Sequence, residues 1–273
     1  MSDIHTGTPP AGKYISINDI EMHYKDQGVG QVLLLLHGGT VSLHQWDAYF
    51  DIFSKSYRVI APDSRGHGRT NNPSDEWNYP LMADDIAAFI EKVGLHKPHI
   101  CGWSDGGQIG LDLAIRYPDL ASTYIIGGAW KDISESNFES MKKMGYIGPG
   151  NVNFNQLEKV RPEYVELIRE LHSSQGADYW KELLIGISRL WLTPFKYTDE
   201  DLINIQVPIL FVMGARDNAI PVESAVNMFR LVPNADLAIV PNADHYLTRT
   251  NINEFSELVM AFLIRYDREN LPD

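Results

Sequence analysis

The chain has 273 residues and a net charge of −13, from 23 Lys and Arg against 36 Asp and Glu. Hydrophobic residues make up 44% of it and charged residues 22%, close to globular averages, which excludes a disordered or collagen-like chain. Because the acidic surface repels phosphate backbones and anionic lipid head groups, we expect neither a nucleic-acid nor a membrane partner. A single cysteine, Cys101, excludes an intramolecular disulfide and a cysteine-based metal site.

The apolar segments of the chain are short. The longest strongly apolar run, Val32–Leu36, cannot cross a bilayer. Residues 1–10 lack both the basic region and the apolar stretch of a signal peptide. We therefore expect a cytoplasmic protein that acts on a small molecule; the sequence leaves its oligomeric state open.

The first half of the chain alternates predicted strands with predicted helices. Two short alternating stretches, Tyr14–Ile17 and Ile20–Tyr24, flank an Asn-Asp turn and predict an opening hairpin. The continuous apolar run Val32–Leu36 predicts a buried strand that enters a glycine loop. Further strands are predicted at Tyr57–Ala61, His99–Gly102 and Thr123–Ile126, and helices at Pro80–Val93 and Gly106–Tyr117.

The pattern changes between about residues 131 and 200, where helices are predicted at Phe138–Met144, Pro162–His172 and Tyr179–Leu192 and no strand is expected. Strands resume at Pro208–Met213 and Leu237–Val240. The last helix is predicted to begin at Asn251, with Glu254 completing a capping box. Alternating strands and helices imply an α/β fold with a mostly parallel sheet covered on both faces. We expect a core of residues 1–130 and 201–273 and a helical cap of residues 131–200.

The segment Gly102-Trp103-Ser104-Asp105-Gly106 carries the strongest chemical signal. It has the pattern G-x-S-x-G between a predicted strand and a predicted helix. Small neighbours permit a strained turn that lifts the Ser104 hydroxyl to the helix N-terminus, where a backbone N–H can face a developing oxyanion. The pattern therefore indicates a nucleophilic serine, although an ordinary glycine-rich turn has the same letters.

With this segment the chain resembles the α/β-hydrolase fold serine hydrolases over almost all of its length. The resemblance rests on His37-Gly38-Gly39, the Arg65-Gly-His-Gly68 loop, Gly102–Gly107, Asp217 and Asp244-His245. It implies an eight-stranded, mostly parallel sheet with a cap inserted in it. The motif sequence Gly-Trp-Ser-Asp-Gly-Gly is most similar to that of the valacyclovir-hydrolase-like esterases, and the macrolide-esterase and enol-lactonase branches look similar too.

The resemblance also implies a catalytic triad in the order serine, acid, histidine. Asp217 follows the strand Pro208–Met213 through a glycine turn, and His245 lies between the last strand and the last helix, so Ser104, Asp217 and His245 are the predicted triad. Asp132 remains an alternative acid, because some members of the family place theirs there. One departure is that Ala243-Asp244 precede the histidine where the family usually has glycine.

The remaining site predictions concern the oxyanion hole and the pocket. Gly39 or Thr40 is expected to supply one backbone donor and Asp105 the other, while Trp103 and Trp130 are expected to form the pocket wall. Of the other histidines, His37 and His67 are expected to organise loops, and His96 and His172 to lie at the surface. No metal constellation, phosphate loop or dinucleotide fingerprint is present, so we expect no cofactor and no metal.

These features predict a hydrolase that cleaves a carboxylic ester or lactone through an acyl-enzyme. A serine nucleophile excludes the dehalogenase and epoxide-hydrolase branches, which need a carboxylate at that place. A carbon–carbon bond hydrolase, a cofactor-free haloperoxidase and a non-catalytic receptor of the same fold remain open. Asp105 could meet a substrate amine, as in an amine-bearing ester or a macrolide, although a carboxylate in the first turn of a helix is also favoured by the helix dipole.

Overall fold

The computed structural model describes residues 12–133 and 138–269. Its centre is an eight-stranded sheet in the order β1-β2-β4-β3-β5-β6-β11-β12. The strands are β1 Lys13–Ile17, β2 Ile20–Gln27, β3 Val32–Leu36, β4 Arg58–Pro62, β5 His99–Trp103, β6 Thr123–Gly127, β11 Ile209–Gly214 and β12 Ala235–Val240. The pairs β1–β2 and β2–β4 are antiparallel and the remaining pairs are parallel. The predicted fold class and the opening hairpin are thus confirmed.

Two hydrophobic clusters lie on opposite faces of the sheet, and β3 contributes to both. Its alternate residues Leu34 and Leu36 join one cluster, together with apolar side chains of the helices α2 (Tyr79–Val93) and α3 (Asp105–Arg116). Leu33 and Leu35 join the other, together with side chains of the helices α1 (Asp47–Phe53) and α11 (Ile252–Glu269). A strand that is buried on both faces gains from apolar residues at every position, which explains the unbroken run in the sequence.

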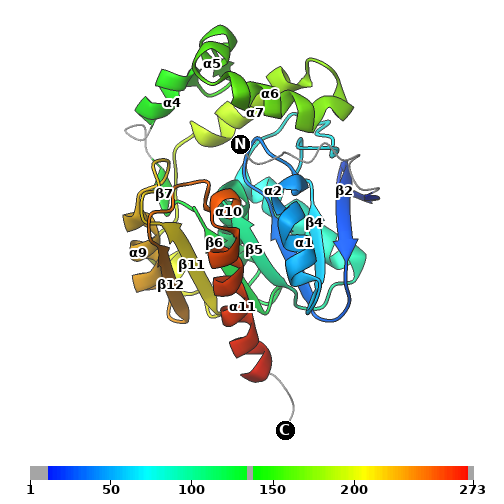
Figure 1. Ribbon diagram of the computed structural model, residues 1–273, viewed down its shortest axis with the longest axis vertical. Coiled ribbons are helices and arrows are strands. Elements are labelled where there is room, and N and C mark those ends of the chain that lie inside the picture. Colours follow the sequence, from blue (N-terminus) through cyan, green and yellow to red (C-terminus); the bar gives the residue numbers. More distant parts are fainter. Residues whose placement is uncertain (1–11, 134–137, 270–273) are drawn as a thin grey trace.

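The helices of the core surround this sheet (Figure 1). In chain order they are η1 Leu43–Trp46, α1 Asp47–Phe53, α2 Tyr79–Val93, α3 Asp105–Arg116, α8 Asp199–Ile203, α9 Val222–Leu231, α10 Leu247–Thr250 and α11 Ile252–Glu269. The predicted capping box of the last helix is not formed among the described residues: the Asn251 side chain accepts a hydrogen bond from Thr250 Oγ1 at 3.0 Å and makes none with Glu254. No described helix is both long and apolar enough to traverse a bilayer.

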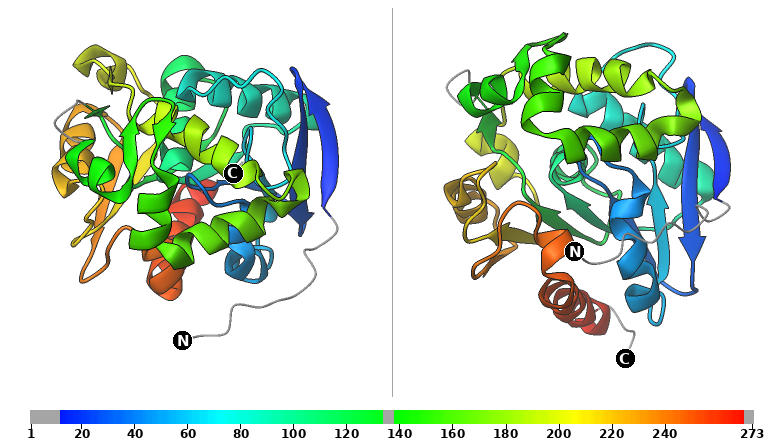
Figure 2. Two further views of the ribbon diagram at one scale, coloured as in Figure 1. Left: turned by 90° about the horizontal axis from the view of Figure 1, so that it is seen from above. Right: turned by 45° about the horizontal axis from the view of Figure 1, so that its top comes forward.

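The cap leaves the sheet after β6 and returns before β11. Its helices are α4 Glu139–Met144, α5 Phe154–Val160, α6 Pro162–His172, η3 Ser173–Gln175 and α7 Tyr179–Trp191. Figures 1 and 2 show α4 to α7 gathered on one side of the sheet. This is the side on which the parallel strands end, because β6 runs directly into the segment that leads to the cap.

The expectation of no strand in the cap is wrong. Two short pairs occur there, β7 Asp132–Ile133 with β10 Phe195–Lys196, and β8 Tyr146–Gly148 with β9 Asn151–Val152. Strands of two or three residues are too short to produce an alternating pattern in the sequence. The first pair joins the two ends of the cap segment at its base.

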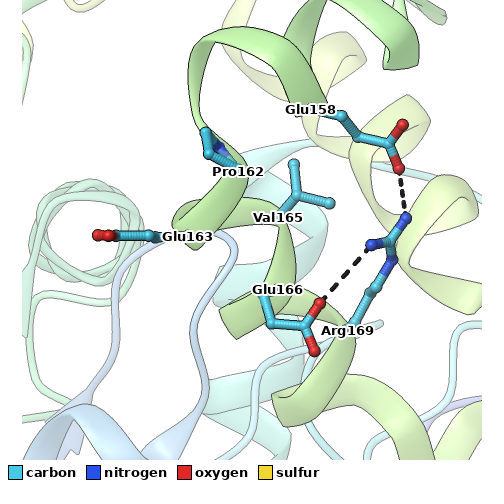
Figure 3. A pocket seen from close by; sticks show the side chains of 6 residues that line it. All are labelled: Glu158, Pro162, Glu163, Val165, Glu166 and Arg169. Atoms are coloured by element: carbon cyan, nitrogen blue, oxygen red, sulfur yellow. Dashed lines mark hydrogen bonds and ion pairs between the residues drawn. The ribbon is translucent and has the colours of Figure 1, made fainter.

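A groove of about 370 Å³ lies on the cap between α5 and α6 (Figure 3). Arg169 crosses it and forms ion pairs with Glu158 and, at 3.6 Å, with Glu166. The single cation of this groove, Arg169, is therefore paired within the cap, and the groove as a whole is acidic.

Candidate active site

Ser104 occupies a strained turn between β5 and α3. Its φ and ψ angles are 56° and −117°, a left-handed conformation that few residues other than glycine adopt. The turn is tight enough to require glycine on both sides. A Cβ atom on Gly102 would lie 2.1 Å from the Gly106 carbonyl oxygen, and one on Gly106 would lie 2.1 Å from the Leu36 carbonyl oxygen. The glycines of the motif therefore follow from the close approach of backbone segments.

The side chains of Ser104, His245 and Asp217 form a continuous hydrogen-bonded chain. His245 Nε2 lies 3.0 Å from Ser104 Oγ, and His245 Nδ1 lies 2.8 Å from Asp217 Oδ2. The second carboxylate oxygen, Oδ1, accepts hydrogen bonds from the backbone N–H groups of Ala219 and Ile220 at 2.9 and 2.8 Å. Because a carboxylate only accepts, Nδ1 carries the proton and the Nε2 lone pair faces the serine.

The loops that carry the acid and the histidine are held together by backbone contacts. Arg216 N–H donates to the Ala243 carbonyl at 2.8 Å. The departure from the family pattern before His245 is accommodated locally, because Asp244 Oδ1 accepts a hydrogen bond from Tyr246 N–H at 2.8 Å. Asp132 lies elsewhere, exposed in β7 and paired with Lys196 of β10. The structure thus brings Asp217, and not Asp132, to the histidine.

The prediction that Trp103 forms a pocket wall is wrong, because Trp103 does not line the cavity over Ser104. Its side chain is buried against Phe255, with ring centroids 5.9 Å apart, and its indole N–H donates to the His245 carbonyl at 3.0 Å. Alternate residues of a strand point to opposite faces, which sends Trp103 beneath the histidine loop. Trp130 does line the cavity.

The backbone groups predicted for the oxyanion hole surround Ser104. Gly39 and Thr40 follow β3 and line the same cavity as Ser104, and Thr40 has a positive φ of 61°. Among the described residues, the N–H groups of Gly39, Thr40 and Asp105 have no protein acceptor. Asp105 opens α3, so its N–H also has the positive end of the helix dipole behind it. These three donors are available to a charge that develops next to Ser104.

Two predictions about histidines have opposite outcomes. His37 organises the loop after β3, since its Nδ1 donates to the Gly38 carbonyl at 2.7 Å and its Nε2 accepts from Ser64 N–H at 2.9 Å. His172, expected at the surface, is buried at the end of α6, and its ring lies 6.0 Å from that of His67. Burial lowers the pKa of His172 to about 4. Its spacing from Val165 and Ile168 places all three on one helix face, a signal that the sequence offered.

Asp105 places a buried carboxylate beside the nucleophile. Tyr79 hydroxyl donates to its Oδ1 at 3.0 Å, and the Trp191 indole N–H lies 2.9 and 3.0 Å from its two oxygens. A Cβ atom on Gly39 would lie 2.3 Å from Asp105 Oδ2, so the carboxylate lies directly against the predicted oxyanion loop. Burial raises the pKa of Asp105 to about 6. Sequence analysis missed Tyr79 and Trp191, because they reach Asp105 from α2 and from the cap.

A cavity of about 560 Å³ lies over Ser104 and is enclosed by core and cap residues. This volume is within the range of sites that bind drug-sized ligands. The charged side chains that line it are Asp105, Lys143, Arg161 and Arg249, together with His245. The aromatic and aliphatic residues that line it include Tyr79, Trp130, Ile133, Phe138, Met141, Met144, Tyr146, Tyr164, Leu167, Ile168, Trp191, Phe195, Ile220 and Tyr246.

Known proteins are similar to this chain over most of its length. A bifunctional esterase/perhydrolase of Acinetobacter calcoaceticus is 27% identical over 276 residues, covering 92% of this chain and 99% of that protein. A 2-hydroxy-6-oxononadienedioate/2-hydroxy-6-oxononatrienedioate hydrolase of Comamonas testosteroni is 23% identical over 287 residues, covering 96% and 99%. The crystal structure of an enol-lactonase from Burkholderia xenovorans has a TM-score of 0.74 at 19% identity, covering 92% of this chain and all of that one. At this identity the structural similarity establishes the fold.

The family model described as "Alpha/beta hydrolase family" matches residues 33–257. This range runs from β3 to α11 and includes the serine turn, both loops of the hydrogen-bonded triad and the cap. The chain therefore belongs to the alpha/beta hydrolase family.

Proposed function

We propose that this chain is a serine hydrolase that cleaves a carboxylic ester or lactone through an acyl-enzyme intermediate. The observation that carries the proposal is the chain of hydrogen bonds from Asp217 through His245 to the strained Ser104, which lines a cavity between core and cap. The esterase and lactonase among the similar proteins agree with it.

In the first half of the reaction Ser104 Oγ attacks the carbonyl carbon while its proton passes to His245 Nε2. Asp217 stabilises the imidazolium that results. When the tetrahedral intermediate collapses, the bond to the leaving oxygen breaks and His245 returns the proton to that oxygen. In the second half a water molecule adds to the acyl-enzyme, again giving its proton to His245, and Ser104 leaves with that proton.

The negative charge of each tetrahedral intermediate needs donors that are already oriented. The unpaired N–H groups of Asp105 and of Gly39 or Thr40 meet this need, because donors fixed before the reaction cost no reorganisation. Gly39 is our first choice for the second donor, since it lies nearer the start of the loop and against Asp105.

A burst assay tests the proposal. Mixing the protein with p-nitrophenyl acetate is expected to release p-nitrophenol in a burst equal to the enzyme concentration or in steady turnover, and a serine-directed phosphonate is expected to abolish both. A phosphonate-sensitive release establishes the hydrolase. If no ester of any acyl chain length and no lactone is hydrolysed, the proposal of ester or lactone cleavage is wrong, and the carbon–carbon hydrolase and the non-catalytic receptor remain.

The finer proposal is that the preferred ester or lactone carries an amine near the scissile bond, as an amino-acid ester or an amine-bearing macrolide does. Asp105 supports it, because this buried carboxylate accepts hydrogen bonds only from the neutral donors Tyr79 and Trp191 and has no ion-pair partner among the described residues. The test compares an amine-bearing ester with its neutral isostere on wild type and on Asp105→Asn. Equal discrimination by both proteins would remove Asp105 from amine recognition.

A second candidate, cleavage of a carbon–carbon bond, is supported by the similarity to the Comamonas hydrolase. The same serine chemistry would act on a ketone in place of an ester carbonyl. Incubation with a 2-hydroxy-6-oxo-dienoate and with p-nitrophenyl esters, ranked by kcat/KM, decides between the two. A peracid product in the presence of hydrogen peroxide would add the perhydrolase activity named for the Acinetobacter protein, because peroxide would replace water as the acyl acceptor.

A further inference from the structure

Three cationic side chains line the cavity over Ser104 at its solvent side. Lys143 comes from α4, Arg161 precedes α6 and Arg249 comes from α10. We call these three residues the basic rim. None of them has an ion-pair partner in the part of the chain that the structure describes. This is notable in a protein with a net charge of −13, where carboxylates are abundant.

Arg161 is the best-defined member of the basic rim. It is half-buried, while Lys143 and Arg249 are exposed. Its Nη2 donates to the Tyr246 hydroxyl at 3.0 Å, its Nη1 lies 3.8 Å from the Met144 sulfur, and its guanidinium lies 5.6 Å from the centre of the Tyr164 ring. All these partners are neutral. Among the residues that the structure describes, no carboxylate therefore balances the charge of this partly desolvated guanidinium.

Arg249 extends the same positive region across Tyr246. Its guanidinium lies 6.0 Å from the centre of the Tyr246 ring, whose hydroxyl is bound by Arg161. Tyr246 directly follows His245. The two arginines therefore bring positive charge to the solvent side of the triad histidine from the core and from the cap.

Among the described residues, Asp105 is the carboxylate that lines this cavity, and it does not pair with the arginines of the basic rim. It is held by Trp191, whose ring lies 5.5 Å from that of Tyr146, and the Tyr146 hydroxyl lies 2.9 Å from the hydroxyl of Tyr164, which packs against Arg161. Asp105 and Arg161 are thus connected only through a series of contacts among three aromatic side chains, and no ion pair joins them. The cavity has an acidic floor beside Ser104 and a basic rim apart from it.

We propose that the basic rim binds a carboxylate on the substrate, placed away from the scissile bond, with Arg161 as the principal contact. This inference rests on the proposed hydrolase function and specifies its substrate class as a carboxylate-bearing ester or lactone. A guanidinium has five N–H donors, and the contacts above use two, which leaves donors for a carboxylate in the forked geometry that arginine favours. Lys143 and Arg249 add positive charge around it.

Matched esters test the proposal. The p-nitrophenyl half-esters of adipic, pimelic and suberic acids carry a free carboxylate at graded distances, and p-nitrophenyl esters of monocarboxylic acids of the same length do not. The measured quantity is the ratio of kcat/KM for the anionic ester to that for its neutral partner, corrected for spontaneous hydrolysis. Wild type is expected to favour the anionic ester at one chain length.

Variants assign the preference to Arg161. Arg161→Gln is expected to lower the ratio by about tenfold or more, because a charge-assisted hydrogen bond is lost, and Arg161→Lys is expected to lower it less. Lys159→Gln is the matched control, since this exposed lysine lies two residues away and does not line the cavity; its ratio is expected to equal that of wild type. Tyr246→Phe keeps the charge but removes the hydrogen bond to Arg161, and is expected to keep the preference.

A binding measurement separates the failure of this proposal from the failure of the proposed function. Titration calorimetry of Ser104→Ala with the monoamides of the same diacids, and with neutral amides of matched length, needs no turnover. If the monoamides bind Ser104→Ala more tightly than the neutral amides, and this difference is lost in Ser104→Ala/Arg161→Gln, carboxylate binding by the basic rim is supported. If the monoamides and the neutral amides bind Ser104→Ala equally, the proposal is overturned. If Arg161→Gln does not fold by circular dichroism, Arg249→Gln takes its place in both assays, with a smaller expected effect.

Discussion

Replacing Asp217 with asparagine exchanges one oxygen for an NH₂ group and reverses the direction of the hydrogen bond between residue 217 and His245 Nδ1. In the wild type Oδ1 accepts from two backbone N–H groups, of Ala219 and Ile220, and Oδ2 faces His245 Nδ1 at 2.8 Å. Only the oxygen of an asparagine can accept from those two N–H groups, so its amide NH₂ turns toward His245. The imidazole must then accept at Nδ1 and carry its proton on Nε2.

A proton on Nε2 points at Ser104 Oγ, 3.0 Å away, and removes the base. The opposite amide orientation would set NH₂ against two N–H groups and lose both hydrogen bonds, at a cost of about 1–3 kcal/mol for each unsatisfied group. We therefore expect kcat to fall by about 10⁴, which corresponds to about 5.4 kcal/mol at about 1.36 kcal/mol for each factor of ten.

The assay is steady-state hydrolysis of a p-nitrophenyl ester, with the thermal unfolding midpoint as a check on the fold. Asp132→Asn is the matched control, because Asp132 is exposed in β7 and makes no contact with His245. Its kcat is expected to stay within about twofold of wild type. If Asp217→Asn kept kcat within tenfold of wild type while Asp132→Asn lowered it, the assignment of the acid would be refuted.

Three further outcomes are expected. Ser104→Ala lowers kcat by at least about 10⁴ without changing the unfolding midpoint; an activity that survives it would mean that another residue is the nucleophile. Preference for an amine-bearing over a neutral ester declines as the pH falls below about 6, because burial raises the pKa of Asp105 to about 6 and a protonated carboxyl no longer attracts an ammonium group. That decline is absent in Asp105→Asn, and a pH-independent preference in wild type would contradict this role. Gly106→Ala strongly destabilises the protein, because its Cβ would lie 2.1 Å from the Leu36 carbonyl oxygen. Gly110→Ala in the same helix is tolerated, because its Cβ would meet nothing nearer than 3.8 Å. Equal unfolding midpoints for the two variants would count against the close approach of backbone segments at the serine turn.

The features that could be predicted from the sequence are those that local chemistry imposes. The serine turn needs glycine at positions 102 and 106 because backbone segments meet there, and this requirement is visible as a motif. The buried strand β3 is apolar at every position because both of its faces are covered. The order of Ser104, Asp217 and His245 follows the order of the strands that carry them.

Other features depend on which side chains meet from separate elements. Trp103 packs beneath the histidine loop, and the strands β7 and β10 pair across the whole cap; neither arrangement leaves a local signal strong enough for prediction. The burial of His172 against His67 differs, because the helical spacing of His172 from Val165 and Ile168 did indicate a buried face.

The same division holds for the chemistry of the site. The sequence by itself determined the strained turn at Ser104, because short-range sterics constrain neighbouring residues. Only the tertiary structure decided that Trp191 of the cap binds Asp105 and that Arg161 lines the cavity with no ion-pair partner among the described residues, because these arrangements depend on how the cap packs against the core. Contacts between side chains distant in sequence arise from packing, which no local pattern records.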